Sequence, residues 1–477
     1  MGNNDSSSAP PPAEAAIIHR PAPTWRLVLY LAWPVLAQQG LNFLVTQSDR
    51  YLAGVYQPEV AYQAAQTTAN YLQWVIISYT LFVTIGSTAL VARFVGAEDR
   101  QRAIHVTNQA LVLAVVFGVA GSAAALTNLP RLVALLQLHD EAAEFAGAYL
   151  WPLFLLLTFQ MVESVGIACL IGAGDTRTGL WVLGGVAVIN LPLAWGFFHG
   201  LGPLPRLGFA GIATGTAVSH MIGCVAVLSI LARGRAGLRL DLKQLRPDWE
   251  LMRRLLRISV PAGLDSMSVV AGQLWFLTII NEVGEAASSA HGIAIGWEAL
   301  GYLSGGAFGT AAMTLVGQNL GAGRPQQAAR AGWVTFGLGL AVMCLMGVVF
   351  FVLAPQMFEL YCPQPEKRPV VEAGVPVLRL VAFAMPALAC TIIFTYALRG
   401  AGDTRVPVLF TWIGFLLVRI PLAYVLTQPD LHLWHVSDDP QANRLFGAWL
   451  AMFADLWVRG AFFLYRFASG RWKKVDV

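Results

Sequence analysis

The sequence predicts an all-α polytopic membrane protein with twelve transmembrane helices, arranged as two six-helix bundles related by a parallel internal repeat. Its composition favours a membrane protein, because 56% of the 477 residues are hydrophobic and only 12% are charged. Soluble domains carry about 25% charged residues. Apolar runs longer than about 18 residues, enough to span a bilayer, recur along the chain. The two halves also share sequence motifs, which indicates a duplicated bundle.

Polar breaks divide the apolar sequence into twelve predicted spans. In chain order they cover residues 28–54, 66–92, 104–127, 144–171, 178–199, 209–232, 251–280, 289–318, 328–353, 371–398, 406–427 and 445–468. At a rise of about 1.5 Å per residue, each can cross a hydrocarbon core of about 30 Å, some with a tilt.

These spans divide the chain into five parts. A polar N-terminal tail, 1–27, is rich in Pro, Ser and Ala, so we expect it to be disordered and not a signal peptide. The N-lobe covers 28–232 and the C-lobe covers 251–468. A basic cytoplasmic linker, 233–250, joins the lobes, and a cytoplasmic tail covers 469–477.

The distribution of basic residues predicts the orientation. With the N-terminus inside, 22 of the 31 Lys and Arg residues fall in cytoplasmic segments, five in the opposite loops and four within spans. Arg399 is counted among the cytoplasmic residues. Cytoplasmic loops of membrane proteins are enriched in Lys and Arg. We therefore expect both termini in the cytoplasm, with the chain in the inner membrane of a bacterium or archaeon.

Several function classes find no support in the sequence. The net charge of +4 is balanced and dispersed, unlike a nucleic-acid-binding surface. The five cysteines form no C-x-x-C pair, so neither a disulfide framework nor a zinc site is expected. The chain has no H-E-x-x-H, G-x-S-x-G or Walker A motif. We therefore expect a protein that is not an enzyme and that has no cofactor and no structural metal.

The repeat relates motifs in the same order in both halves. Residues 89–103 (ALVARFVGAEDRQRA) align with 314–328 (TLVGQNLGAGRPQQA), and GAGDTR occurs at 172–177 and at 400–405. Each half contains six spans, an even number, so both halves enter the bilayer from the same side. Parallel repeats of this kind are typical of transporters that rock around a central site.

At these motifs the sequence resembles the multidrug and toxic compound extrusion family of cation antiporters, over nearly the whole chain. The resemblance also includes Asp49-x-x-x-x-Gly54 in the first span and the run AHGIA that begins at Ala290. It implies two bundles around a central cavity and efflux of amphipathic cations driven by inward protons or sodium. Residues 371–398 contain no aspartate, so the chain is more similar to the DNA-damage-inducible-F branch than to the branch described for norfloxacin export.

Asp49 is the first candidate coupling residue. A charge within a bilayer is costly, so it needs a partner, a wet cavity or protonation, and Asp49 matches the family's aspartate in the first span. A salt bridge is the structural alternative, although the adjacent Arg50 points about 100° away on a helix. Polar residues that could line a substrate cavity are Gln38, Gln39, Asn42 and Gln47 on the same span and Gln160 on the fourth.

Glu163 and Asn190 are the candidates on the fourth and fifth spans. By resemblance, polar residues of these helices complete a proton or sodium site beside the aspartate of the first span. Many relatives have a further aspartate one turn after the asparagine, where this chain has Ala194. A sodium site near Asp49 with a full set of oxygen ligands is therefore in doubt, and a structural hydrogen bond is the alternative for Glu163.

The C-lobe spans contain three acids and three bases. Asp265, Glu298 and Asp455 share this lobe with Arg379, Arg419 and Arg459. Asp455 and Arg459 are four residues apart and are expected to form a structural ion pair on one helix face. Asp265 and Glu298 match acidic positions of the family, and coupling and network roles remain open for both.

Together these observations predict a secondary active efflux antiporter that works by alternating access. Its expected partners are small organic cations and membrane lipids, with a proton or sodium as coupling ion, no nucleic acid, and a monomeric protein. A lipid or oligosaccharide-lipid flippase of the same superfamily is the alternative, for which a more basic cavity is expected. A membrane-embedded enzyme is a more remote alternative.

Overall fold

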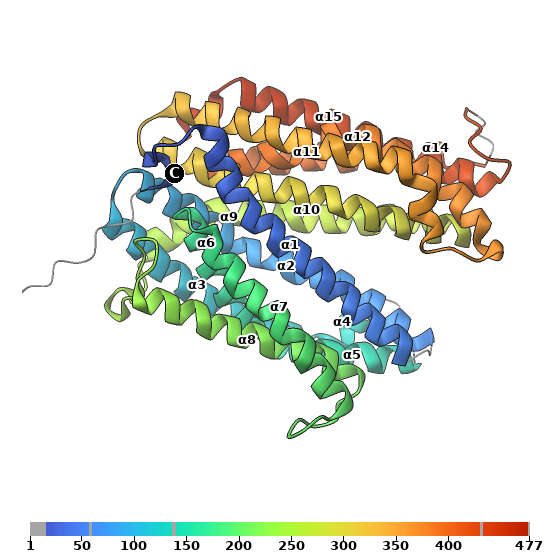
Figure 1. The fold of residues 1–477 in the computed structure, drawn as a ribbon, viewed down its shortest axis with the longest axis horizontal. Helices are drawn as coiled ribbons and strands as arrows, with labels where there is room; N and C mark the ends of the chain where they lie inside the picture. The colour runs from blue at the N-terminus through green and yellow to red at the C-terminus, as the bar shows by residue number, and fades with distance from the viewer. Residues whose placement is uncertain (1–15, 57–59, 136–139, 430–432, 476–477) are drawn as a thin grey trace, which may run out of the picture.

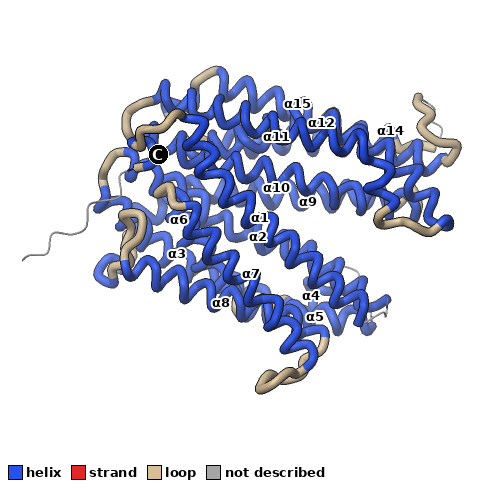
Figure 2. The backbone as a smooth tube through the Cα atoms, viewed as in Figure 1, coloured by secondary structure: helices blue, strands red, loops and turns tan. Residues whose placement is uncertain are grey.

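The computed structural model describes residues 16–56, 60–135, 140–429 and 433–475, without the side chains of 46–73 and 135–142. Within these residues the protein is helical and contains no strand (Figure 2). Eleven helices are long and apolar enough to span a membrane, and a bent helix pair supplies a further span. All twelve predicted spans are therefore found.

Eight α-helices make up the described part of the N-lobe. They are α1 (Thr24–Tyr56), α2 (Val60–Gly96), α3 (Arg100–Thr127), α4 (Leu129–Leu135), α5 (Asp140–Leu155), α6 (Leu157–Gly172), α7 (Thr176–His199) and α8 (Phe209–Arg233). The sequence predicts a continuous fourth span, but α5 and α6 meet at a 52° bend. Pro152 lies in the last turn of α5, and proline disrupts the hydrogen bonds of a helix interior.

The C-lobe contains the remaining spans. Its helices are α9 (Trp249–Asn281), α10 (Glu285–Gly321), α11 (Pro325–Glu359), α12 (Arg368–Gly400), α13 (Arg405–Trp412), α14 (Ile420–Leu426) and α15 (Pro440–Ala468). A π-helical stretch, Ile413–Arg419, joins α13 to α14 and makes them one span. Such stretches are rare and frequently occur at functional sites.

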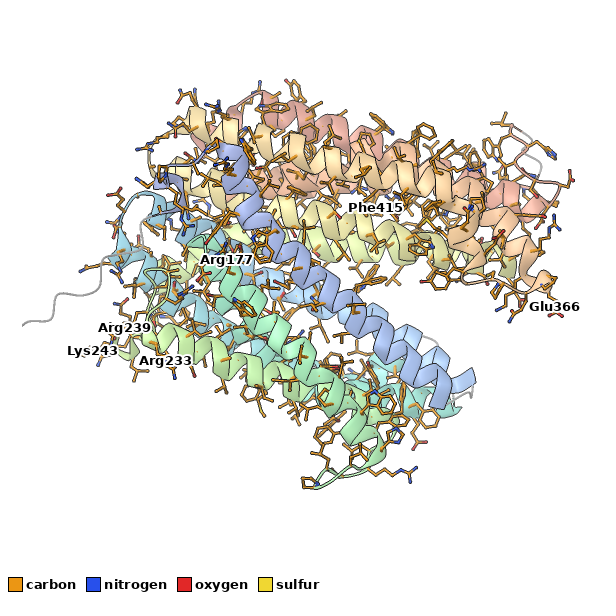
Figure 3. The ribbon with its side chains drawn as sticks, viewed as in Figure 1. Arg177, Arg233, Arg239, Lys243, Glu366 and Phe415 are labelled. Carbon is orange, nitrogen blue, oxygen red and sulfur yellow. The ribbon has the colours of Figure 1, made fainter. Side chains whose placement is uncertain are left out.

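The two lobes converge at one end of the molecule and diverge toward the other (Figure 1). Arg177, Arg233, Arg239 and Lys243 lie at the convergent end, and Glu366 lies at the opposite end (Figure 3). The two largest buried apolar clusters each join residues of both lobes, since α1 packs into the C-lobe core and α9 into the N-lobe core. Small residues also let helices of the two lobes cross closely.

The repeated motifs meet at the convergent end. Gly96 ends α2 and Gly321 ends α10, and the repeat makes them equivalent. A Cβ on Gly96 would overlap the carbonyl oxygen of Gln318, and a Cβ on Gly321 would overlap that of Arg93. Because Arg93 and Gln318 are also equivalent, α2 and α10 cross pseudo-symmetrically. Only glycine permits this approach of two backbones.

The two GAGDTR loops are tight turns at the same end. Gly174 and Gly402 have φ values of 93° and 84°, a region that favours glycine. Asp175 caps α7 by accepting a hydrogen bond from the Thr178 amide, and it pairs with Arg235 at 2.7 Å. In the second loop Asp403 instead pairs with Arg466, also at 2.7 Å. The two aspartates of the repeated motif therefore act differently, since Asp175 caps the helix after its loop and the helix after the second loop has no side-chain cap.

Candidate functional site

A buried carboxylate and a histidine form the centre of the N-lobe. Glu163 of α6 is 1% exposed, and its Oε2 lies 2.6 Å from Nδ1 of His220 on α8. A Cβ on Gly223, three residues after His220, would overlap Glu163 Oε1. The absence of a side chain at Gly223 thus lets the carboxylate lie against α8. Burial of a carboxylate in a membrane is costly without such a partner.

Asn190 of α7 also binds α8, one helical turn before His220. Its side-chain amide donates to Thr216 Oγ1 at 2.9 Å, and Asn190 is 2% exposed. Thr216 and His220 are four residues apart, so they lie on one face of α8. Two buried oxygens, Oε1 of Glu163 and Oδ1 of Asn190, find no hydrogen-bond donor within the described residues. Both predicted residues thus bind adjacent turns of one face of α8, and each has an oxygen without a donor among the described residues.

The side chains of Asp49 and Gln47 lie outside the described residues, but the helix that contains them is placed. Helices α1 and α7 pack together and both run away from the convergent end (Figure 1). Leu41 contacts the position of Gly184. Asn190 lies about 9 Å beyond Gly184 along α7, and Asp49 about 12 Å beyond Leu41 along α1. Asp49 is therefore at nearly the same height as Asn190, on a neighbouring helix.

The other predicted cavity residues are partly or fully accessible. Gln38 and Gln39 are half-buried on α1 and Asn42 is exposed. Gln160 is half-buried on the first turn of α6, one turn before Glu163. These four amides lie on the same two helices as the acids, and nothing in the described contacts makes them a single binding surface.

Asp455 is the centre of a buried ion-pair network in the C-lobe. Its Oδ1 accepts from Nε of Arg459 at 2.6 Å and its Oδ2 from Nε of Arg419 at 2.8 Å. Arg419, in the π-helical stretch, also donates to Gln273 of α9 at 3.2 Å. Both guanidinium groups lie over the Phe415 ring, at 4.3 and 4.9 Å from its centroid. The sequence-predicted pair is present, with a second arginine on the same carboxylate.

Asp265 binds Arg399, which lies one residue beyond the predicted span 371–398. Arg399, in the last turn of α12, is buried, and its Nη2 donates to Asp265 Oδ2 at 2.7 Å. Arg379 was expected in the C-lobe network, but it is exposed and lies 5.6 Å from the Phe351 ring. Membership of a span therefore does not reveal whether a residue lies on the buried face of its helix.

Among the three acids of the C-lobe spans, Glu298 has no ion pair with another described residue. It is 2% exposed on α10, and its Oε1 has no hydrogen-bond partner among the described residues. Arg419 and Arg459 are close enough to act on it electrostatically. Glu298 thus lies beside the Asp455 network without being bonded into it.

The residues that sequence reasoning missed share one property. Each of them forms a hydrogen bond with a residue of another helix, 26 to 146 positions away in the sequence. They are His220, Thr216, Arg399 and Gln273. Nothing in the local sequence distinguishes these positions from other polar residues in apolar helices.

Comparison with known proteins identifies what the chain is similar to. The MatE family model matches residues 34–195 and 261–425. A multidrug resistance protein NorM of Burkholderia vietnamiensis is 30% identical over 440 residues, which cover 89% of this chain and 90% of the relative. A probable multidrug resistance protein NorM of Thermotoga maritima is 26% identical over 452 residues, or 94% and 93% of the two chains.

Solved structures show the same fold. A multidrug resistance MATE family transporter of the MOP superfamily in an outward-facing conformation matches with a TM-score of 0.82 at 18% identity, over 94% of this chain and 97% of the other. A MOP superfamily transporter from Pyrococcus furiosus, whose binding pocket is described as reversed in polarity, matches with a TM-score of 0.84 at 17% identity and the same coverage.

Proposed function

The chain belongs to the MatE family, and we propose that it exports amphipathic organic cations in exchange for inward protons. The resemblance found from the sequence motifs is thereby confirmed at the level of the family. The coupling ion, the class of substrate, the site and the orientation are our proposals. The observation that supports them best is the Glu163–His220 pair, which places a proton-exchanging side chain on a buried acid.

The pair has the properties that proton coupling requires. Glu163 is buried, whereas the His220 side chain is 22% exposed. Histidine is the side chain that most readily exchanges a proton near neutral pH. His220 thus connects the carboxylate to a more accessible position. Protonation of Glu163 or Asp49 removes a negative charge that attracts the organic cation, so proton uptake and cation release are linked.

The charges of the two lobes support a cationic substrate. In the C-lobe, Arg399, Arg419 and Arg459 all bind carboxylates. The N-lobe offers Glu163 and, on α1, Asp49 at the height of Asn190. A flippase for anionic lipids would need basic groups without such partners facing the substrate.

The distribution of basic residues supports an orientation of the protein in the membrane. The basic residues gather where the lobes converge (Figure 3), and cytoplasmic segments are enriched in Lys and Arg. We therefore assign the convergent end to the cytoplasm of a bacterial inner membrane. The arrangement is then closed toward the cytoplasm, and alternating access requires the Gly96–Gly321 crossing to separate.

Export of ethidium from proteoliposomes tests the proposal. A proton gradient and a sodium gradient are imposed separately on wild type, Asp49→Asn and Glu163→Gln, with Glu144→Gln as a control acid that is not buried. We expect export under the proton gradient in wild type and in the control, and its loss in the other two. Export driven only by the sodium gradient would show that sodium, and not the proton, is the coupling ion. Folded protein without export under either gradient would favour lipid-linked cargo.

A further inference from the structure

Residues 16–23 come before the first membrane-spanning helix and lie folded at the convergent end, where Figure 1 shows them in dark blue. Ile17–His19 forms a single 3-10 turn, in which the amide of His19 donates to the carbonyl of Ala16 at 2.9 Å. Helix α1 begins soon after this turn, at Thr24. We call residues 16–23 the N-terminal strap.

The strap packs against α10 of the C-lobe. The Ile17 side chain is 2% exposed and belongs to the buried apolar cluster that includes Leu315 of α10. Ile18 and Ala22 pack against the same cluster, and the 3-10 turn itself contacts α10. Burial of an isoleucine side chain is among the larger favourable contributions that one residue makes to packing. Ile17 is therefore the anchor of the strap.

The strap also contacts two loops of the N-lobe. A Cβ on Gly174, in the first GAGDTR loop, would lie 3.2 Å from Cβ of Ile17 and 3.5 Å from Nε2 of Gln318 on α10. Nε2 of His19 lies 3.5 Å from Oε1 of Glu98, in the loop between α2 and α3. The glutamate is largely exposed, so this pair contributes little energy. Ile17 is thus the main contact of the strap with both lobes.

Hydrogen bonds join the two lobes next to Ile17. Nε2 of Gln318 on α10 donates to the carbonyl of Gly172 at 3.0 Å, and Oγ1 of Thr314 donates to that of Ile171 at 3.1 Å. Both carbonyls belong to the last turn of α6 in the N-lobe, and both donor side chains are fully buried. Water competes with protein hydrogen bonds wherever it can enter. The apolar side chain of Ile17 helps to keep water away from these bonds.

We propose that the N-terminal strap is a latch, which stabilises the lobes in their converged arrangement and must release before they separate at this end. Because Ile17 is in contact with both lobes, separation of Gly174 from α10 exposes part of a side chain that is buried when the lobes meet. The cost of this exposure favours the converged arrangement. A weaker anchor shifts the equilibrium toward the separated arrangement. The latch rests on the alternating access proposed above, but on neither the coupling ion nor the substrate.

Thiol labelling of the lobe junction tests the latch. A cysteine is introduced at Ala92, a fully buried residue of α2, where a Cβ on Gly317 of α10 would lie 2.8 Å from the Ala92 Cβ. Purified full-length protein in detergent reacts with a polar maleimide, without an ion gradient or an organic cation. Protein without the introduced cysteine gives the background from the native cysteines. The variants Ile17→Val and Ile17→Ala shorten the anchor in two steps. The control is Ile212→Ala, since Ile212 is fully buried in an apolar cluster whose described members all belong to the N-lobe.

We expect labelling to be about tenfold faster in Ile17→Ala than in wild type, with a smaller increase in Ile17→Val and no change in Ile212→Ala. Ile212→Ala should lower thermal stability instead. If Ile17→Ala is poorly folded, Ile17→Val is compared with the control. Equal labelling of wild type and the Ile17 variants would overturn the proposal, as would the same acceleration in Ile212→Ala. Because labelling requires neither a gradient nor ethidium, failure of the latch is distinguishable from failure of the export proposal.

Discussion

Glu163 and His220 lie 2.6 Å apart although 57 residues separate them in the sequence. The contact joins α6 to α8 in the middle of the N-lobe, and one turn along α8 Thr216 holds Asn190 in the same way. Helix α8 contributed no candidate to the predicted site, yet it positions both N-lobe residues that the sequence singled out. The predictions below test this arrangement and the contacts that support it.

Replacement of His220 by Asn should impair proton coupling more than folding. The substitution leaves Glu163 a hydrogen-bonding neighbour but removes the imidazole, whose ring nitrogens can both donate and accept a proton. We expect the pH dependence of ethidium export to change, with a rate about tenfold lower at neutral pH. His199→Asn, at the end of α7, is the control with an unchanged pH profile. A His220→Asn profile that superimposes on wild type would remove the histidine from the mechanism.

Substitution of Gly223 by Ala should displace the Glu163 carboxylate. The added methyl group would overlap Glu163 Oε1 and lie 2.6 Å from Val186 Cγ2, so the packing between α6 and α8 must change. Overpacking of this kind typically costs about 1–3 kcal/mol. We expect lower thermal stability together with reduced export. Gly185→Ala has open space around it and should leave both unchanged.

Substitution of Gly96 by Ala should weaken closure of the convergent end. Its Cβ would meet the backbone of Gln318, which cannot rotate away as a side chain can. The junction should open more often, so that a cysteine introduced at Ala92, which contacts Gly317 across the junction, reacts faster with a thiol reagent. Gly306→Ala on α10 meets open space and serves as the matched control. Equal labelling in both variants would argue against a role in closure.

Removal of the Asp455 carboxylate should strongly destabilise the C-lobe. Asp455→Asn leaves Arg419 and Arg459, both buried, without their counter-charge. Loss of one partner of a buried pair costs about 3–5 kcal/mol. Glu372→Gln removes the exposed pair with Arg368 and should cost less than about 1 kcal/mol. Thermal denaturation in detergent distinguishes the two, and similar midpoints would show that the network contributes little.

The first GAGDTR loop should lose stability in acid. Burial acts to raise the pKa of Asp175, but hydrogen bonds from Thr178 and the adjacent Arg235 outweigh it and hold the pKa below its ordinary 3.8. A carboxyl with a lowered folded-state pKa stabilises the protein above the unfolded value, and this contribution is lost as pH falls through the folded value. Thermal stability below about pH 4 should therefore fall less steeply in Asp175→Asn than in wild type, while the exposed Asp438→Asn keeps the wild-type slope.

The sequence predicted local and periodic features well. The twelve spans follow from apolar runs of sufficient length, and the duplicated architecture follows from motifs repeated at a constant offset. Asp455 and Arg459 are found paired because a helix brings residues four apart onto one face. The bend between α5 and α6 and the π-helical stretch were not anticipated, because apolar composition does not report on backbone hydrogen-bond register.

The sequence alone determined the membrane class, the number of spans and the family membership. Hydropathy and repeated motifs can be read from the order of residues without knowledge of the packing. The partners of the buried charges were decided by the tertiary structure. Arg399 instead of Arg379 binds Asp265, and His220 binds Glu163, because these contacts depend on which helix faces meet. Two faces of an apolar helix can have the same composition. Only the packing of the helices decides which face is buried and which residues it contacts.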